Sequence, residues 1–324
     1  MRILIKKIRA VMKKRLSIFI IMLFILFILI YPADCVKAAA NGLILWYENI
    51  LPALLPFTIF SNILIQSGYL DDLIRAASPV LNHLFFHHPQ AAYPVISGFL
   101  FGFPMGSKTT ADLLREGKLT VPEANILCAM CNNISPVFVS SYLLISSLGI
   151  YDKTWLTYAI LYLPPLVSGM ILLRLTKPVP LKKNKASDSN LNFQIIDAGI
   201  MNGFETLLKL GGYIMLFSLL SQMCLRLAGN QEFLCICLTG ITEITNGIHV
   251  ISQSSAIPGF VKYPLLTGLT AFGGLSGFAQ TASMVKDTMV KDTGSKNTGI
   301  SMRFYFVFRL VQTGVSSLLA FWLL

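Results

Sequence analysis

The residues best suited to chemistry stand where glycine and proline interrupt apolar sequence. In Gly98–Thr110, three glycines and a proline precede Ser107 and Lys108. A half-helix that begins at Ser107 would point free N–H groups, together with the charge of Lys108, at a carboxylate or phosphate. The alternative is that the Lys108 amine reaches the membrane surface along its aliphatic stem. We predict an anion-binding site here, lined by Ser107 and Lys108.

A second interruption, Gly268–Thr281, carries Gly273 and Gly274 in apolar sequence and ends on Gln280. Lipid cannot satisfy free backbone groups, so irregular backbone inside a membrane is buried in protein or lines a watery cavity. Paired interruptions in two halves of a chain are typical of transporter binding sites. Two ordinary kinked helices would have the same composition. We predict that the two interruptions meet and that Gln280 lines the site.

An amide cluster lies downstream of the first interruption. Asn132, Asn133 and Ser135 stand just before Pro136, which removes a backbone donor and frees a carbonyl group. Amide and hydroxyl groups beside irregular backbone can bind a polar solute. We therefore predict that these three side chains also line the site.

Glu243 lies in an apolar segment with Thr242, Thr245 and Asn246 around it. An ionisable residue inside a membrane segment costs about 2.5–3.5 kcal/mol on insertion scales, so it indicates a functional site. Glu243, Thr245 and Asn246 are predicted to bind a cation, a proton or a donor group of the substrate. The alternative is a re-entrant hairpin tip whose polar groups satisfy one another.

Catalytic and metal chemistry have little support. The sequence lacks a hydrolase elbow, a zinc-binding helix and a phosphate-binding loop with correct glycine spacing. Its six cysteines lie mainly in apolar segments without histidines at ligand spacing, so they are interpreted as small buried hydrophobes. We expect no enzyme activity, no cofactor and no metal.

Composition predicts an all-α polytopic membrane protein. Of the 324 residues 54% are hydrophobic and 13% are charged, against about 25% charged residues in soluble domains. The net charge of +11 gathers before residue 16 and between Arg174 and Lys185. Both basic runs flank apolar spans, which predicts a cytoplasmic location and contact with lipid headgroups rather than nucleic acid.

The order of segments predicts two related halves, each with one broken or re-entrant segment. Residues 1–38 are interpreted as a basic terminus and a retained signal-anchor helix, because the apolar stretch 16–31 exceeds a usual signal-peptide core. Residues 39–175 and 193–324 form the two membrane repeats, joined by a basic cytoplasmic linker at 176–192. Similar short runs around Glu48 and Glu205 support the repeat, and both carboxylates are expected near the membrane interface. Residues 303–324 are predicted to form a plain membrane helix.

Three motifs together carry a family resemblance. Gly102–Lys108, Cys131–Pro136 and Glu243–Gly247 resemble the sporulation integral membrane protein YlbJ family, within the wider Gate-domain, or nucleoside-recognition, membrane proteins. The resemblance runs from about Trp46 to the C-terminus. It implies an endospore former and a multi-pass protein of the bacterial cell membrane, in the mother-cell-derived membrane around the forespore.

The resemblance also implies a function, the transport of dipicolinic acid, a small planar dianion. A nucleoside transporter and a non-transporting component of a sporulation complex are the alternatives. The expected partners are an anionic solute and the lipid bilayer, with a coupling ion and a homo-oligomer as further expectations.

Overall fold

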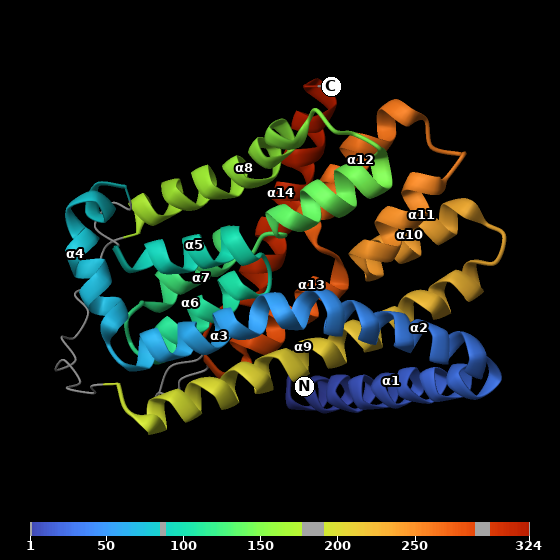
Figure 1. The fold of residues 1–324 in the computed structure, drawn as a ribbon. Coiled ribbons are helices and arrows are strands. Elements are labelled where there is room, and N and C mark those ends of the chain that lie inside the picture. Colours follow the sequence, from blue (N-terminus) through green and yellow to red (C-terminus); the bar gives the residue numbers. More distant parts are fainter. Residues whose placement is uncertain (1, 85–88, 177–190, 289–298, 324) are drawn as a thin grey trace.

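The computed structural model describes residues 2–84, 89–176, 191–288 and 299–323 (Figure 1). Within these ranges the secondary structure is helical, without strands, which confirms the predicted all-α polytopic membrane fold. Three described helices are long and apolar enough to cross a membrane, or four if the bent pair at Tyr31 counts as one span. The predicted linker at 176–192 lies almost wholly outside the described residues, as do His87 and His88.

The first half begins with a long helix. The helix α1 (Arg2–Ile30) ends at Tyr31, and Pro32 begins the next helix at a position where a missing N–H costs nothing. The predicted boundary at residue 38 therefore falls inside a helix. From Pro32 the chain continues without a gap through α2 (Pro32–Leu45), the π-helix η1 (Trp46–Ile50) and α3 (Leu51–Gln66).

Two short helices then fold into a hairpin. After α4 (Tyr69–Leu84) and the 3-10 turn η2 (Pro89–Ala91), α5 (Ala92–Phe101) and α6 (Met105–Arg115) pack side by side. Ser97 Oγ and Thr109 Oγ1, one from each arm, lie 2.8 Å apart. We call α5–α6 the first hairpin.

An interrupted helix follows the hairpin. The helix α7 (Val121–Cys131) starts at a capping box formed by Thr120 and Glu123. It breaks at Asn132–Pro136 and continues as the π-helix η3 (Phe138–Leu148). The helix α8 (Thr154–Leu175) then completes the half.

The second half repeats this order of elements. A long helix, α9 (Phe193–Ala228), leads to the second hairpin, α10 (Glu232–Thr242) and α11 (Ile244–Gln253). The second interrupted helix is α12 (Gly259–Phe272) with α13 (Gly274–Val285), followed by a 3-10 turn and α14 (Met302–Trp322). In Figure 1 the first hairpin enters from the end where α4 lies, and the second enters from the opposite end.

The order of the elements shows which helix breaks of the two halves are equivalent, and it differs from the pairing predicted from the sequence. The first break at Gly102 pairs with the hairpin break at Glu243, and the amide-rich break at Asn132 pairs with Gly273, about 140 residues on in both cases. The sequence prediction had instead paired the first break with Gly268–Thr281. The two segments look alike because each needs glycine, at Gly102 with φ 78° and at Gly273 with φ 80°.

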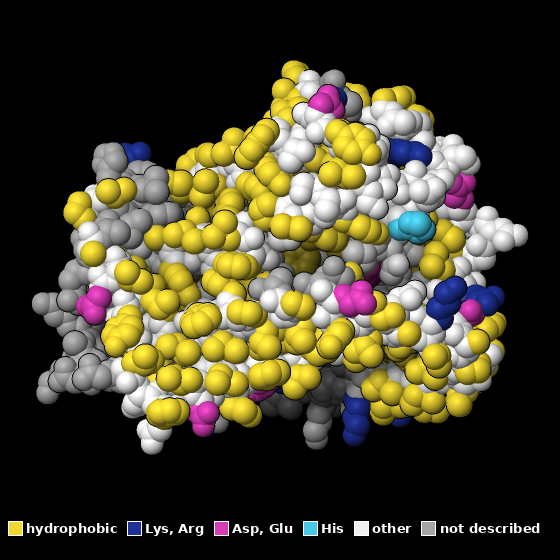
Figure 2. Space-filling view, in the orientation of Figure 1, with side chains coloured by type: hydrophobic (Ala, Val, Ile, Leu, Met, Phe, Trp, Pro, Cys, Tyr) yellow, Lys and Arg dark blue, Asp and Glu magenta, His cyan; other side chains and the backbone are white. Residues whose placement is uncertain are grey.

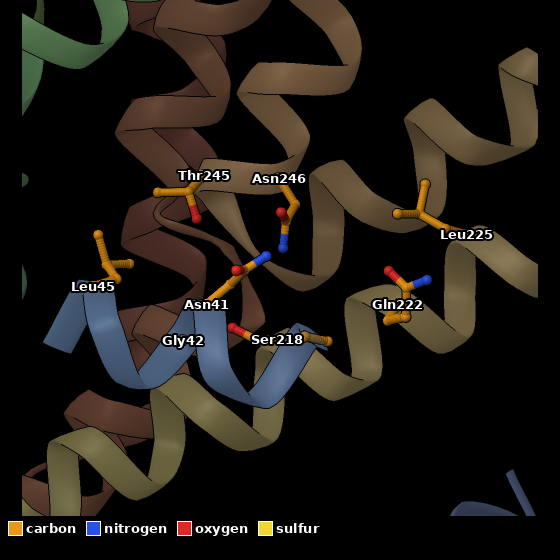
Figure 3. A pocket seen from close by; sticks show the side chains of 9 residues that line it. Asn41, Gly42, Leu45, Ser218, Gln222, Leu225, Thr245 and Asn246 are labelled. Carbon is orange, nitrogen blue, oxygen red and sulfur yellow. The ribbon is translucent and has the colours of Figure 1, made fainter. Parts of the chain in front are cut away.

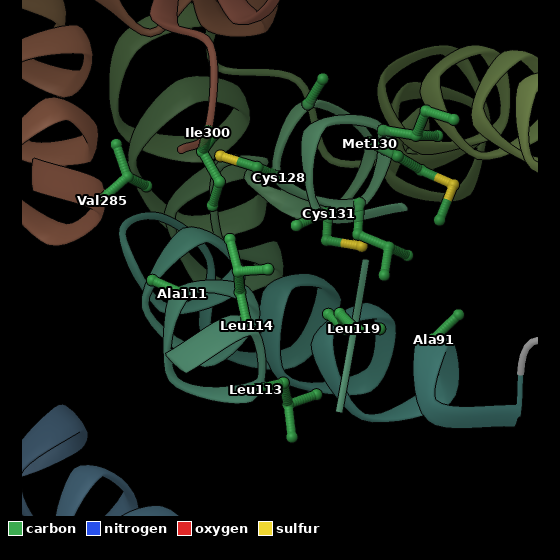
Figure 4. Packing of buried hydrophobic residues seen from close by; sticks show 14 of the residues in the cluster. Ala91, Ala111, Leu113, Leu114, Leu119, Cys128, Met130, Cys131, Val285 and Ile300 are labelled. Carbon is green, nitrogen blue, oxygen red and sulfur yellow. The ribbon is translucent and has the colours of Figure 1, made fainter. Parts of the chain in front are cut away.

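The apolar residues divide between an interior and a lipid-facing surface. The interior is close-packed around α6 and α7, where Leu113, Leu127 and Met130 are fully buried (Figure 4). Outward-facing side chains such as Phe60 and Trp155 are largely exposed, and hydrophobic atoms cover much of the face in Figure 2. A soluble protein rarely exposes so continuous an apolar surface, so this surface suits contact with lipid.

Candidate functional site

The helix breaks of both halves gather in the centre of the molecule. The Phe103 ring at the tip of the first hairpin packs against the second interrupted helix, where a Cβ built on Gly273 would lie 3.4 Å from the ring. A Cβ built on Gly102 would lie 2.5 Å from the Ser135 backbone nitrogen. The two predicted interruptions therefore do come together, and they meet beside the amide-rich break.

The amide-rich break is held by tyrosines of α8. Tyr162 donates to the Ile134 carbonyl and Tyr158 donates to the Pro136 carbonyl, both at 2.9 Å. Pro136 has no N–H group and so interrupts the helical hydrogen bonds at this point, and its carbonyl also accepts from the Ser140 hydroxyl at 3.1 Å. Ser135, a predicted site residue, uses its hydroxyl to accept the Phe138 N–H at 3.3 Å and so caps η3. Much of the polar chemistry at this break satisfies the backbone itself.

Asn132 joins the two halves. Its amide donates to Thr281 Oγ1 at 2.6 Å and to the Tyr305 hydroxyl at 2.9 Å. Its Oδ1 accepts the Ser107 N–H at 3.4 Å, while the Ser107 hydroxyl donates to the Pro104 carbonyl at 2.7 Å. Two predicted site residues, Ser107 and Asn132, thus touch each other, but all these groups are buried and committed to protein partners.

Lys108, a predicted site residue, is held in a buried ion pair. Its Nζ lies 2.8 and 2.6 Å from the two carboxylate oxygens of Asp112, one helical turn away. Both side chains are only 9% exposed, and Arg115 adds a second cation at 2.7 Å from Asp112 Oδ1. In this structure Lys108 is therefore buried and paired with Asp112, while the cluster of Lys108, Arg115 and Asp112 keeps a net charge of +1.

Glu243 forms the tip of the second hairpin, as the alternative interpretation held. Its carboxylate caps α11 by accepting the Asn246 N–H at 2.9 Å and a short hydrogen bond from the Thr245 hydroxyl. Gln280 is likewise satisfied locally, because its Nε2 donates to Ser276 Oγ at 3.0 Å. Among the described residues, no hydrogen bond joins the Glu243 carboxylate or the Gln280 amide to Ser107 or Asn132.

A polar cavity of about 110 Å³ opens beside this second tip (Figure 3). Thr245 and Asn246 contribute from α11, Asn41 from α2, and Ser218 and Gln222 from α9. Figure 3 shows the Asn41 and Asn246 amides directed toward one another across the space. Sequence reasoning had found Thr245 and Asn246 but not the other three, because they lie singly in long apolar helices.

Arg309 is the main residue that sequence reasoning missed. It lies on α14, which is long and apolar enough to cross a membrane as predicted, and it is only 4% exposed. Its Nη1 donates to Asn133 Oδ1 at 3.0 Å and to the Ala271 carbonyl at 3.3 Å. Asn133, another predicted site residue, is thereby held at the break. No carboxylate pairs with Arg309 among the described residues, and its Nε and Nη2 atoms have no partner there.

Comparison with known proteins gives the family context. Residues 47–151 match a family model described as Gate: Nucleoside recognition. The chain is also 25% identical over 325 aligned positions to the sporulation integral membrane protein YlbJ of Bacillus subtilis (strain 168), covering 87% of this chain and 76% of the relative. Part of this chain is therefore similar to the Gate family, and most of it is similar to a sporulation membrane protein. No solved structure matches this chain.

The Gate segment corresponds to a definite part of the fold. It begins within η1 and covers α3, α4, the first hairpin and the first interrupted helix. The similarity to YlbJ extends over most of the chain, so it includes elements of the second half as well. The relation confirms the family resemblance read from the three motifs and agrees with a transporter-like membrane protein.

Proposed function

We propose that this protein transports a small organic anion across the membrane, with the helix breaks of its two halves forming the passage. One observation carries the proposal. Two hairpins enter from opposite ends of the molecule, and their tips, at Phe103 and Glu243, reach interrupted helices in the centre. Opposed half-helices of this kind are how secondary transporters place binding groups at membrane depth.

The arrangement supports transport because each hairpin packs against elements of the other half. The helix α6 packs against α13, and α11 packs against η3. A hairpin that swings away from its opposite partner would open the centre to one side of the membrane only. Alternating access then follows from moving one hairpin at a time, which is the physical requirement for a carrier rather than a pore.

An anion is the first substrate class because Arg309 is a buried cation at the helix breaks with no carboxylate partner in the described chain. A cation in a low-dielectric interior is costly unless compensated, so such residues favour negative ligands. The relative is named only as a sporulation integral membrane protein. Dipicolinate as the specific anion, and a membrane around the forespore as the location, are what the family resemblance implies, and we propose them on that ground.

A nucleoside is the second candidate, and a different observation favours it. The cavity beside the second hairpin is lined by neutral amides and hydroxyls, including Asn41, Gln222 and Asn246. Nucleosides are neutral and hydrogen-bond well to such groups. The family description names nucleoside recognition, although it covers only residues 47–151.

The test is flux into proteoliposomes that contain the full chain, with labelled dipicolinate and labelled uridine measured side by side. We expect dipicolinate uptake to saturate and to accelerate when unlabelled dipicolinate is trapped inside, since only a carrier exchanges solutes in this way. Protein-free liposomes set the background. Uridine uptake alone would favour the nucleoside candidate. If neither solute moves, a non-transporting role in a sporulation complex becomes the better hypothesis.

A further inference from the structure

The guanidinium of Arg309 is anchored on one side and open on the other. Nη1 makes both of its hydrogen bonds, to Asn133 Oδ1 and to the Ala271 carbonyl. The remaining edge, formed by Nε and Nη2, has no partner among the described residues, and both atoms are buried. This edge carries two nearly parallel N–H bonds, which is the fork that binds a carboxylate through both oxygens.

The anchored side explains why the guanidinium stays in place. The helix α7 ends at Cys131 and α12 ends at Phe272, so Arg309 bonds to groups just after one C-terminus and just before the other. Each helix C-terminus carries a partial negative charge that favours a cation. The Tyr305 ring, one turn earlier on α14, lies 5.4 Å from the guanidinium carbon. These contacts fix the orientation of the group without using its Nε/Nη2 edge.

A second unpartnered group lies one turn further along the same helix. Gln312 is 3% exposed, and its Nε2 donates to Ser168 Oγ at 3.0 Å. Its Oε1 has no partner in the described chain. Buried polar groups are nearly always hydrogen-bonded, and leaving one unpaired costs about 1–3 kcal/mol. Unmet hydrogen-bonding capacity is therefore concentrated on one stretch of α14 beside the amide-rich break.

We propose that the Nε/Nη2 edge of Arg309 is a carboxylate-binding site, which holds one carboxylate of the transported solute through two parallel hydrogen bonds. This inference rests on the proposed transport function and deepens it, because it replaces Lys108 by Arg309 as the group that recognises the anion. The site is closed in this structure. It becomes reachable when the break at Asn132–Pro136 or a hairpin tip moves.

The experiment measures binding to the purified full-length chain in lipid nanodiscs by calorimetry. The probe is pyridine-2,6-dicarboxylate, and its neutral diamide is the control ligand of the same shape. Arg309→Gln removes the charge, Arg309→Lys keeps the charge but not the fork, and Arg303→Gln makes the same charge change at an exposed site on the same helix. Proteoliposome flux of the dicarboxylate is measured on the same four proteins.

We expect Arg309→Gln to weaken dicarboxylate binding by roughly 10- to 100-fold, the worth of hydrogen bonds to a charged group. Arg309→Lys should recover only part of that loss, Arg303→Gln should match wild type, and the diamide should bind no protein well. Equal dicarboxylate affinity in wild type and Arg309→Gln would overturn the site. So would a response to inorganic phosphate without one to the dicarboxylate.

Two further outcomes separate this site from the proposed function. If wild type and Arg309→Gln carry the dicarboxylate equally, the transport proposal stands and the site is wrong. If wild type binds the dicarboxylate through Arg309 but carries nothing, the site stands and the transport proposal is wrong. Should Arg309→Gln fail to fold, Arg309→Lys decides, because undiminished binding by a lysine would show that no fork is needed.

Discussion

Breaking the Lys108–Asp112 pair tests whether Lys108 is structural. The pair is buried, with N–O separations of 2.8 and 2.6 Å and both side chains 9% exposed. Asp112→Asn would leave Lys108 and Arg115 close together without their shared carboxylate. Removing one partner of a buried ion pair costs about 3–5 kcal/mol, whereas replacing both by apolar residues is often neutral. We therefore expect Asp112→Asn to be much less stable than Lys108→Met/Asp112→Leu.

The chain supplies a matched control on α9. Lys209 and Glu205 are also one helical turn apart with an N–O distance of 2.6 Å, but their side chains are 48% and 63% exposed. Exposed pairs of this spacing contribute about 0.3–0.5 kcal/mol, so Glu205→Gln should change stability by no more than that. The two pairs differ in burial and in the second cation, Arg115, that Asp112 also binds, so their difference measures the cost of leaving two cations without that carboxylate.

The assay is thermal unfolding of detergent-solubilised protein, completed as a double-mutant cycle, with flux in proteoliposomes measured in parallel. A double variant that is less stable than Asp112→Asn would refute the structural account. If Lys108→Met/Asp112→Leu folded with wild-type stability but had lost dicarboxylate flux, Lys108 would be a substrate ligand after all, and the original prediction would be restored.

Two further predictions concern the packing at the breaks. Gly98→Ala should lower the free energy of unfolding by about 1–3 kcal/mol, because the added Cβ would lie 1.9 Å from the Cys131 carbonyl oxygen. The control is Gly212→Ala on α9, where the added Cβ has open space, so this variant should be neutral or slightly stabilising. Both are measured by the same thermal unfolding assay. Asn132→Leu should cost about 1–3 kcal/mol by removing the donor to Thr281 and Tyr305, and amide exchange by mass spectrometry should rise in α13; unchanged exchange there would contradict the bridging role.

The positions of the breaks could be predicted from sequence because local chemistry causes them. Gly102 and Gly273 adopt positive φ, and Pro136 removes a backbone donor. The direction that the chain takes after each break could not be predicted. The arms α5 and α6 fold back on each other, whereas α12 and α13 continue past Gly273 without packing together. A glycine permits both outcomes, and contacts with distant helices select one.

The partners of the charged residues were harder to predict, for two different reasons. Asp112 lies four residues after Lys108, so the helical spacing alone could have revealed the pair. Arg309 gave no such signal, because its partners Asn133 and Ala271 lie far away in sequence. It lies near the start of residues 303–324, which were predicted to form a plain membrane helix. Only the fold brings α14 against both interrupted helices.

The two hairpins are held unequally, and this decides which one we expect to open. The first hairpin is tied to the opposite half by Arg115, which donates to the Met284 carbonyl at 3.1 Å, and by the Phe103 ring against Gly277. Among the described residues, the second hairpin makes one side-chain hydrogen bond to the opposite half, from the Tyr142 hydroxyl to the Thr245 carbonyl at 2.9 Å. The open polar cavity also lies on the side of the second hairpin. The second hairpin also packs its apolar residues against η3, but it has fewer polar contacts to the opposite half than the first. We therefore expect the second hairpin to move first and to open a route from that cavity to Arg309.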